Sequence, residues 1–320
     1  MPLPKVGGDV LIGSFLIDPL RRTRGLSELA ETDLGYRGSS LDDLTVEATA
    51  ERAGDIAAVV NALNTMQGES ISELTKLIQL ADEVEWPVIP VLAEMEHEGI
   101  GIDPKYLNKF SVELADEIGD IVQTIYGMAD TEFNLNSPQQ VSEVLFEKLN
   151  LPTDGIKHLA KSGFYSTDIT TLTKLQAYPI IQELMKYREY SKLKGTYADV
   201  LPKMIDKNNR LHTTFSMTIA QTGRLSSLDP NLQHIPIRTD LGKRIRTAFV
   251  AKPGHVFISG DYSQFELRLA ASLSGDEGMI EAFNNDQDIH QLTAAEVLGI
   301  KPEEVTKKMR YQAKAVNFGI

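Results

Sequence analysis

The chain has 320 residues, enough for about two or three domains, and 42% of them are apolar while 24% are charged. This balance is typical of a soluble globular protein, and no apolar run approaches the roughly 18–20 residues that a membrane span needs. The absence of cysteine excludes disulfides, cysteine-bound zinc and thiol catalysis, and it fits a reducing cytosol. The N-terminal run VLIGSFLI lacks a basic leader and a cleavage site, so no signal peptide is expected.

The net charge of −13 is distributed unevenly along the chain. Residues 26–100 hold 16 acidic side chains against 3 basic ones, so the rest of the chain is balanced. Bases exceed acids by 8 to 3 over residues 203–250 and by 5 to 2 over residues 301–320. Because phosphates respond to the local field more than to the net charge, these segments could bind nucleic acid in an acidic protein. An ordinary solvated face is the alternative interpretation of each block.

The first predicted elements are a short apolar strand or helix at residues 10–17 and a long helical pattern from Ser70. In this pattern, apolar residues recur at i, i+3, i+4 and i+7. Pro87 and Pro90 must kink or split the helix because proline has no backbone N–H to donate, and Gly99 is expected to close it.

The middle of the chain is predicted to contain two further helices and a strand. In NLNSPQQVSEVLF, Ser137 is the expected N-cap, Pro138 the first helical residue and Gln140 the partner in a capping box. The next helix covers about residues 177–203, and the alternating RLHTTFSMT predicts a strand.

A polar, turn-rich loop, QTGRLSSLDPNLQHIPIR, follows this strand. Its Gly, Ser, Asn and Gln residues are flanked by Arg224 and Arg238, and such a set can reach backbone phosphates and minor-groove acceptors. An ordinary polar loop is the alternative.

The stretch HVFISGDYSQFELRLAASLSG, residues 255–275, predicts a buried strand, a polar turn and an apolar helix. The strand from Val256 to Ile258 is followed by Asp261, and Glu266 stands at the head of the helix. A carboxylate at the end of a strand is a common metal ligand, and Mg²⁺ prefers one or two carboxylates together with phosphates and water. A turn or helix cap is the alternative role for Asp261.

Two helices are predicted at the C-terminal end of the sequence. The first is capped by Asp288 and ended by Gly299. In the second, VTKKMRYQAKAVNFG, the residues Arg310, Lys314 and Phe318 lie at i, i+4 and i+8 and therefore share a face. Two cations and an aromatic ring in a row could hold a triphosphate and stack on a base or sugar. A solvated basic helix is the alternative.

The motifs TGRLSSLDPNLQHIP, DYSQFELR and RYQAKAVNFG, in this order and at these separations, closely resemble those of family A DNA polymerases, the bacterial DNA polymerase I type. The resemblance covers essentially the whole chain, including DPLRRTRGLSELA, EHEGIGIDPKYL and DIHQLTAAEVLG. It implies an α+β fold, with the C-terminal part of a 3′–5′ exonuclease-like α/β domain at residues 1–68. Residues 69–320 would be a polymerase domain with a helical thumb, an incomplete palm sheet and the first finger helices. The implied protein is a cytoplasmic monomer of the bacterial nucleoid that uses deoxynucleoside triphosphates and primer–template DNA.

The resemblance also implies roles for the residues around the palm turn. Asp261 resembles the palm aspartate that bridges two catalytic Mg²⁺ ions, and the backbone carbonyl of Tyr262 would be a further metal ligand. Glu266 resembles the gate glutamate that crowds the nucleotide 2′ position, and Gln264 would lie near the templating pair. One carboxylate cannot hold both ions, and the family's second palm aspartate lies in a later His-Asp-Glu turn that these 320 residues do not include. They are therefore expected not to extend a primer alone.

Other residues are matched to the nucleotide and the DNA. Arg310 and Lys314 would grip the triphosphate with help from His290, and Phe318 would pack on the sugar. Arg224 and Gln233 would contact the DNA minor groove at the primer terminus. Arg238 would lie in the same substrate channel, and Lys192 and Lys194 would belong to the thumb that holds the duplex.

Some positions depart from the family pattern. Of the exonuclease metal ligands only Asp55 has a counterpart, and Glu51 stands where a tyrosine is expected, so no 3′–5′ hydrolysis is expected. His234 replaces an asparagine, and Ser216 and Met217 replace polar amides in the primer-contact region.

Three alternatives to a DNA polymerase remain open from the sequence. One is a DNA-binding fragment without catalysis, and another is a relative of single-subunit RNA polymerases. Glu266 opposes the RNA polymerase because a gate carboxylate excludes ribonucleotides. A stand-alone exonuclease is the least favoured.

Overall fold

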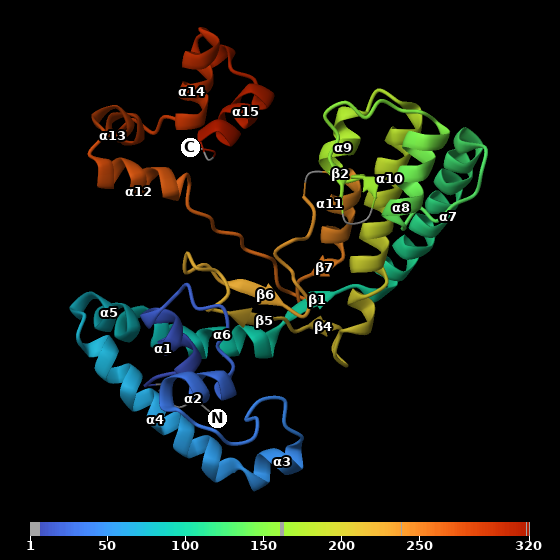
Figure 1. Ribbon diagram of the computed structural model, residues 1–320. Helices are drawn as coiled ribbons and strands as arrows, with labels where there is room; N and C mark the ends of the chain where they lie inside the picture. The colour runs from blue at the N-terminus through green and yellow to red at the C-terminus, as the bar shows by residue number, and fades with distance from the viewer. Residues whose placement is uncertain (1–6, 161–162, 238, 318, 320) are drawn as a thin grey trace. The chain divides into compact units, whose positions relative to one another are not determined.

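The computed structural model describes residues 7–160, 163–237, 239–317 and 319 of a chain that divides into two compact units (Figure 1). The N-terminal unit is Met1–His255 and the C-terminal unit is Val256–Ile320. Helices dominate both units, and the described strands form three small sheets. The predicted α+β class is therefore confirmed as a mixture of many helices and small sheets. None of the described helices is both long and apolar enough to cross a membrane.

The N-terminal unit begins with helices that have a core of their own. They are α1 (Val10–Ile17), α2 (Leu26–Leu34), α3 (Val46–Glu51) and α4 (Ala53–Ser72). Residues 10–17 form a helix rather than a strand, since the Asp9 carboxylate accepts hydrogen bonds from the N–H groups of Leu11 and Ile12. Leu29 of α2 and Leu63 of α4 are fully buried in this core.

The long helical pattern from Ser70 is interrupted at residues 73–74, and from Thr75 it continues through both prolines with a change of helix type just before Pro87. After α4 come α5 (Thr75–Leu80), the π-helical segment η1 (Ala81–Glu85) and α6 (Trp86–Glu98). Pro87 lies in the first turn of α6. Because it cannot donate the hydrogen bond to the carbonyl four residues earlier, the turns just before it widen to the π-helical form. Pro90 lies inside α6 without ending it.

Three short strands form the central sheet: β1 (Ile100–Ile102), β4 (Arg210–Leu211) and β7 (Phe249–Val250). β1 lies in the middle and is antiparallel to both neighbours, with Ile100 opposite Leu211 and Ile102 opposite Phe249. Gly99 ends α6, as predicted, with φ of 60°. A Cβ atom there would lie 2.3 Å from the carbonyl oxygen of Leu211, so this turn requires glycine.

The largest helical bundle of the N-terminal unit is built around two long helices. Its elements are α7 (Pro104–Ala129), α8 (Pro138–Ser142), η2 (Glu143–Lys148), α9 (Ile169–Lys174), α10 (Pro179–Leu193), η3 (Lys194–Ala198), η4 (Leu201–Lys203) and α11 (Asp240–Thr247). α7 and α10 lie side by side (Figure 1). Leu145, Ile181 and Leu184 are fully buried in one core between these helices, and Leu107 and Leu201 in a second.

The start of α8 agrees with the predicted cap but not with the full capping box. Ser137 Oγ accepts a hydrogen bond of 3.4 Å from the N–H of Gln140, which confirms the N-cap. In a capping box, the Ser137 N–H would donate to the Gln140 side chain. Here this N–H donates to the carbonyl of Asn134 instead. Gln140 Oε1 therefore accepts from the N–H of Asn134 instead, at 2.7 Å.

Two hairpins complete the N-terminal unit. They are β2 (His158–Leu159) with β3 (Phe164–Tyr165), and β5 (Thr214–Ser216) with β6 (Ser226–Leu228). The predicted strand RLHTTFSMT is thus two short strands, β4 and β5, in different sheets. Between them, the buried Thr213 Oγ1 lies 2.6 Å from Ser227 Oγ.

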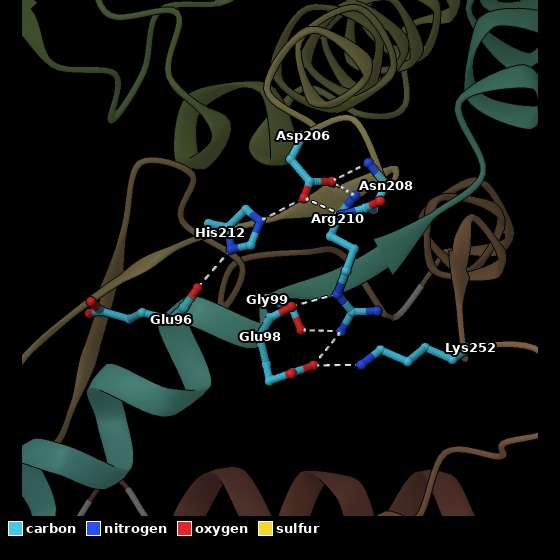
Figure 2. Close-up of polar contacts among 8 residues, drawn as sticks. All are labelled: Glu96, Glu98, Gly99, Asp206, Asn208, Arg210, His212 and Lys252. Carbon is cyan, nitrogen blue, oxygen red and sulfur yellow. Dashed lines mark hydrogen bonds and ion pairs between the residues drawn. The ribbon is translucent and has the colours of Figure 1, made fainter. Parts of the chain in front are cut away.

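A polar cluster joins the end of α6 to the central sheet (Figure 2). The Arg210 guanidinium donates to the backbone carbonyls of Glu98 and Gly99, which lie in the C-terminal turn of α6 and have no helical partner. Lys252, after β7, donates to Glu98 Oε2 at 2.7 Å. The other members of the cluster are Glu96, Asp206, Asn208 and His212.

The C-terminal unit contains helices but no described strand. They are α12 (Phe265–Ser274), α13 (Glu277–Asn284), α14 (Ile289–Leu298), η5 (Pro302–Glu304) and α15 (Lys307–Asn317). The prediction of a buried strand from Val256 to Ile258 is wrong for this structure: the two residues are 80% and 93% exposed. A strand needs hydrogen-bonding neighbours, and no described strand pairs with this segment.

Candidate functional site

The two helices α14 and α15 bring together three of the residues that the sequence assigns to a triphosphate. Asp288 caps α14 as predicted, and Gly299 ends it in the left-handed conformation. His290 lies in the first turn of α14, and the charges of Arg310 and Lys314 on α15 reach its ring, where they lower its pKa. Burial is the largest cause of this lowered pKa, and the charge of Asp288 opposes it only in part, so the imidazole is neutral at pH 7.

The tautomer of His290 is set by a residue that the sequence did not single out. Asn317 Nδ2 lies 3.0 Å from His290 Nδ1 and 3.2 Å from Thr293 Oγ1. An amide NH₂ group only donates, so Nδ1 is the acceptor and the ring proton is on Nε2. The signal in the sequence was the position of Asn317, three residues after Lys314 on the same helix.

Arg310 makes a close ion pair within the same helix pair. Its Nε and Nη2 atoms lie 2.7 and 2.6 Å from Asp288 Oδ2. Phe318, the third member of the predicted face on this helix, lies outside the described residues, as does Arg238 of the predicted DNA-binding set.

The predicted palm residues lie on an exposed turn at the start of α12. Asp261 and Glu266 are exposed, and Tyr262 is 81% exposed with its ring 5.3 Å from that of Phe265. Gln264 has a positive φ of 52°, and its side-chain oxygen is buried without a hydrogen-bond partner.

Arg268 contacts both this turn and the helix α13 that follows α12. Its Nε donates to the carbonyl of Ser263 at 3.0 Å, and its guanidinium lies 4.6 Å from the ring centroid of Phe283 on α13. The sequence motif contained Arg268 but suggested no role for it.

Two groups on this turn, the Asp261 carboxylate and the Tyr262 backbone carbonyl, are of the kind that could contribute to a metal site. A carboxylate from Asp261 and the carbonyl of Tyr262 are hard oxygen ligands, and their exposure leaves room for water and phosphate oxygens, which Mg²⁺ retains or prefers. Among the described residues, no three His, Asp or Glu side chains gather into a metal-binding group.

The N-terminal unit has a cavity of about 1170 Å³ that two of the predicted DNA-binding residues line. Lys192 and Gln233 both contribute to its wall, which residues of α9 and α10 form together with residues 233–237 and 239. Arg188 supports this wall: its Nη2 donates to Thr167 Oγ1 at 3.1 Å, and burial lowers its pKa. Nothing in the sequence distinguishes Arg188 except its position on the predicted helix.

Lys194 and Gln233 of the predicted DNA-binding set form hydrogen bonds to other residues of the chain. Lys194 Nζ lies 2.8 Å from Asp199 Oδ2 and 3.0 Å from Ser111 Oγ, so this ammonium group joins η3 to α7. Gln233 accepts from the N–H of Ser227 at 3.1 Å and donates to the carbonyl of Leu225 at 2.9 Å. The amide therefore fixes the exposed turn that carries Arg224, the residue before Leu225.

The two positions matched to an exonuclease are exposed residues at a helix junction. Glu51 is the last residue of α3, and Asp55 lies in the first turn of α4. The Asp55 carboxylate is 3.8 Å from Arg52 Nε.

Known proteins resemble this chain over nearly its whole length. The profile of DNA polymerase family A matches residues 104–320. The thermostable DNA polymerase I of Thermus caldophilus is 43% identical over 318 residues, and the DNA polymerase I of Pseudomonas aeruginosa is 37% identical over 331 residues. Each comparison covers 98% of this chain and 36% of the relative, so the chain spans about a third of their length.

The fold is similar to a solved polymerase structure. The POL domain of Pol1 from M. smegmatis, in complex with DNA primer–template and dNTP, is 36% identical and superposes with a TM-score of 0.85. The comparison covers 97% of this chain and 53% of that one. With the sequence motifs, the relatives and the fold in agreement, the chain belongs to DNA polymerase family A.

Proposed function

We propose that this chain is part of a template-directed DNA polymerase, which transfers nucleotides from deoxynucleoside triphosphates to a primer 3′-hydroxyl. The observation that carries the proposal is the convergence of His290, Arg310 and Lys314 at the junction of α14 and α15. Two cations, of which Arg310 is held by Asp288, beside a neutral imidazole that donates from Nε2 match the polyanionic tail of a nucleotide, which needs both charge and directed donors.

The turn before α12 would supply the reacting centre. Asp261 and the Tyr262 carbonyl would hold Mg²⁺, which when bound activates the primer hydroxyl and offsets charge on the leaving pyrophosphate. Glu266 would exclude a 2′-hydroxyl by occupying its place, while Gln264 would lie by the templating pair and Phe318 by the sugar. Because Asp261 is one carboxylate and a two-metal centre needs more, we expect residues 1–320 to bind substrates without extending a primer.

Primer–template DNA would bind the N-terminal unit. The cavity beside α10 presents Lys192, an exposed cation, and Gln233 holds the loop of Arg224 in place. Arg238 completes the proposed duplex-binding set, whereas Lys194, matched to the same set, would keep its ion pair with Asp199 and support the fold. Phosphate contacts by such cations would position the duplex without reading its sequence.

The fold also has a natural division by role. Residues 1–68 would be the remnant of an exonuclease-like domain without hydrolytic activity, and the bundle of α7 to α10 would be the thumb. The sheet β4–β1–β7 would belong to the palm and α12 to α15 to the fingers. We propose a monomer that acts on DNA in the cytoplasm.

Binding and extension by the 320-residue chain test the proposal. A fluorescent primer–template should bind with an affinity that falls steeply as salt rises from 50 to 200 mM, since several cations displace counterions. With Mg²⁺ and all four nucleotides, the primer should keep its length. Salt-independent binding, or no binding by folded chain, would contradict the DNA site, and extension would contradict the expected inactivity.

A further inference from the structure

Asp288 divides its two carboxylate oxygens between two tasks. Oδ1 accepts hydrogen bonds from the backbone N–H groups of His290 at 2.9 Å and Gln291 at 3.2 Å, which caps α14. Oδ2 accepts a hydrogen bond from Arg310 Nε at 2.7 Å and lies 2.6 Å from Arg310 Nη2, 22 positions later on α15. One side chain therefore sets both the start of α14 and the direction of the Arg310 guanidinium.

The ion pair is partly shielded and well connected. The side chains of Arg310 and Asp288 are 40% and 26% exposed. Burial alone would raise the pKa of Asp288, but the bonds from Arg310 and from the Gln291 N–H outweigh it and lower that pKa. Asp288 is therefore ionised at neutral pH, and Arg310 is held by a charge-assisted contact instead of moving freely in solvent.

This contact leaves part of the guanidinium available for a ligand. Arginine has five N–H groups in a fixed plane, and Asp288 accepts from the one on Nε and lies in ion-pair contact with Nη2. Among the described residues, no hydrogen bond from Arg310 Nη1 is found, so this side of the guanidinium can receive phosphate oxygens in a direction that is set before the ligand arrives. Orienting a long side chain in advance reduces the entropy lost on binding.

We propose that Asp288 is the positioning residue for Arg310, holding its guanidinium in the orientation that receives the triphosphate. The inference rests on the proposed nucleotide site and adds to it a residue that would not touch the nucleotide. The competing effect is repulsion between the carboxylate and the phosphates. That repulsion is reduced because two backbone N–H groups and the positive end of α14 already face the carboxylate.

Asparagine at this position separates the two tasks. In Asp288→Asn, the amide oxygen still caps α14, because asparagine is as good an N-cap as aspartate. The NH₂ group that replaces Oδ2 cannot accept a hydrogen bond, so Arg310 is released. Asp276→Asn is the matched control, since Asp276 caps α13 by accepting from the Met279 N–H at 2.7 Å.

Calorimetric titration of the 320-residue chain with dATP and with inorganic tripolyphosphate provides the test. We expect Asp288→Asn to weaken both ligands about three- to tenfold and Arg310→Ala to weaken them by at least as much. Asp276→Asn should leave binding unchanged, and circular dichroism should show equal helix content in all variants. In the Arg310→Ala background, Asp288→Asn should weaken ligand binding no further. If Asp288 acted only on the stability of the helix, its effect on binding would persist without Arg310.

Two results would overturn the inference, and they differ in meaning. If Arg310→Ala weakens binding but Asp288→Asn leaves it unchanged or tightens it, Asp288 is only a helix cap or a competing anion, and the nucleotide site stands. If wild-type chain and Arg310→Ala both fail to bind tripolyphosphate and dATP, the proposed nucleotide site is itself wrong and the role of Asp288 falls with it.

Discussion

Lys252 Nζ lies 2.7 Å from Glu98 Oε2, so an ion pair joins the loop after β7 to the end of α6 across 154 positions of sequence. Arg210 of β4 donates to the carbonyls of the same helix end. The central sheet has strands of only two or three residues and thus few ladder hydrogen bonds. The contacts of Arg210 and Lys252 therefore add side-chain links between the end of α6 and the two edge strands of the sheet.

The ion pair predicts an acid-dependent contribution to stability. The hydrogen bond from Lys252 lowers the pKa of Glu98 below its ordinary value of 4.5. A carboxyl with a depressed pKa stabilises the folded chain above the unfolded-state pKa, and this contribution is lost as the pH falls through the folded-state value. Glu98→Gln should therefore lower the thermal midpoint slightly at pH 7 and reduce its loss between pH 5 and 3. Glu94→Gln, on an exposed position of α6, is the control; equal pH curves for both variants and wild type would refute the coupling.

His290 predicts a second pH effect, in the C-terminal unit. Burial lowers its pKa below 6.5, so on acidification the unfolded chain takes up a proton before the folded chain does. Stability from this group is present above about pH 6.5 and is lost as the pH falls through the folded-state pKa. An NMR titration of the imidazole should give a midpoint below that of the same residue in urea-unfolded chain. A midpoint at or above the unfolded one would show that the ring is not buried as described.

The core between α7 and its neighbours predicts the cost of a cavity. Leu114 is 1% exposed and belongs to the core that includes Leu107 and Leu201. Leu114→Ala should lower the free energy of unfolding by about 2–5 kcal/mol, measured by urea denaturation. Val112→Ala on the same helix, where the side chain is 62% exposed, should change it by no more than about 0.5 kcal/mol. Equal losses in the two variants would contradict the described burial.

Two neighbouring lysines should differ in their effect on DNA binding. Lys192 is exposed at the cavity, whereas Lys194 is held by Asp199 and Ser111. Lys192→Ala should weaken primer–template binding and reduce the slope of its salt dependence by about one. Lys194→Ala should mainly lower the thermal midpoint and leave that slope nearly intact. The reverse pattern, with the larger change of slope for Lys194→Ala, would mean that Lys194 leaves its partners to bind phosphate.

Local features of the fold could be predicted from the sequence, while features that join distant segments could not. The caps Ser137 and Asp288 and the terminator Gly299 were predictable because each acts within one helical turn. The run Val256–Ile258 has the composition of a strand, but strand formation depends on a neighbour that composition does not reveal.

The same limit applies to the candidate site. The common face of Arg310 and Lys314 follows from helical periodicity, and the motif resemblance added His290 to them. The contacts of Arg310 with Asp288 and of Asn317 with His290 join two helices and span 22 and 27 positions, so they required the structure. The ion pair between Lys194 and Asp199 could not be predicted either, because the sequence does not show whether a lysine is paired with an acidic side chain in the folded chain.

The segment from residue 251 to residue 264 contains no helix or strand, and its apolar residues Phe257 and Tyr262 are 58% and 81% exposed. Backbone without ladder hydrogen bonds enters a protease active site at little energetic cost. An enzyme that cleaves after aromatic residues should therefore cut the polypeptide here under mild digestion. That would yield the helices α12 to α15 as a separate peptide, whose ability to stay folded and to bind tripolyphosphate could then be studied without the remainder of the chain.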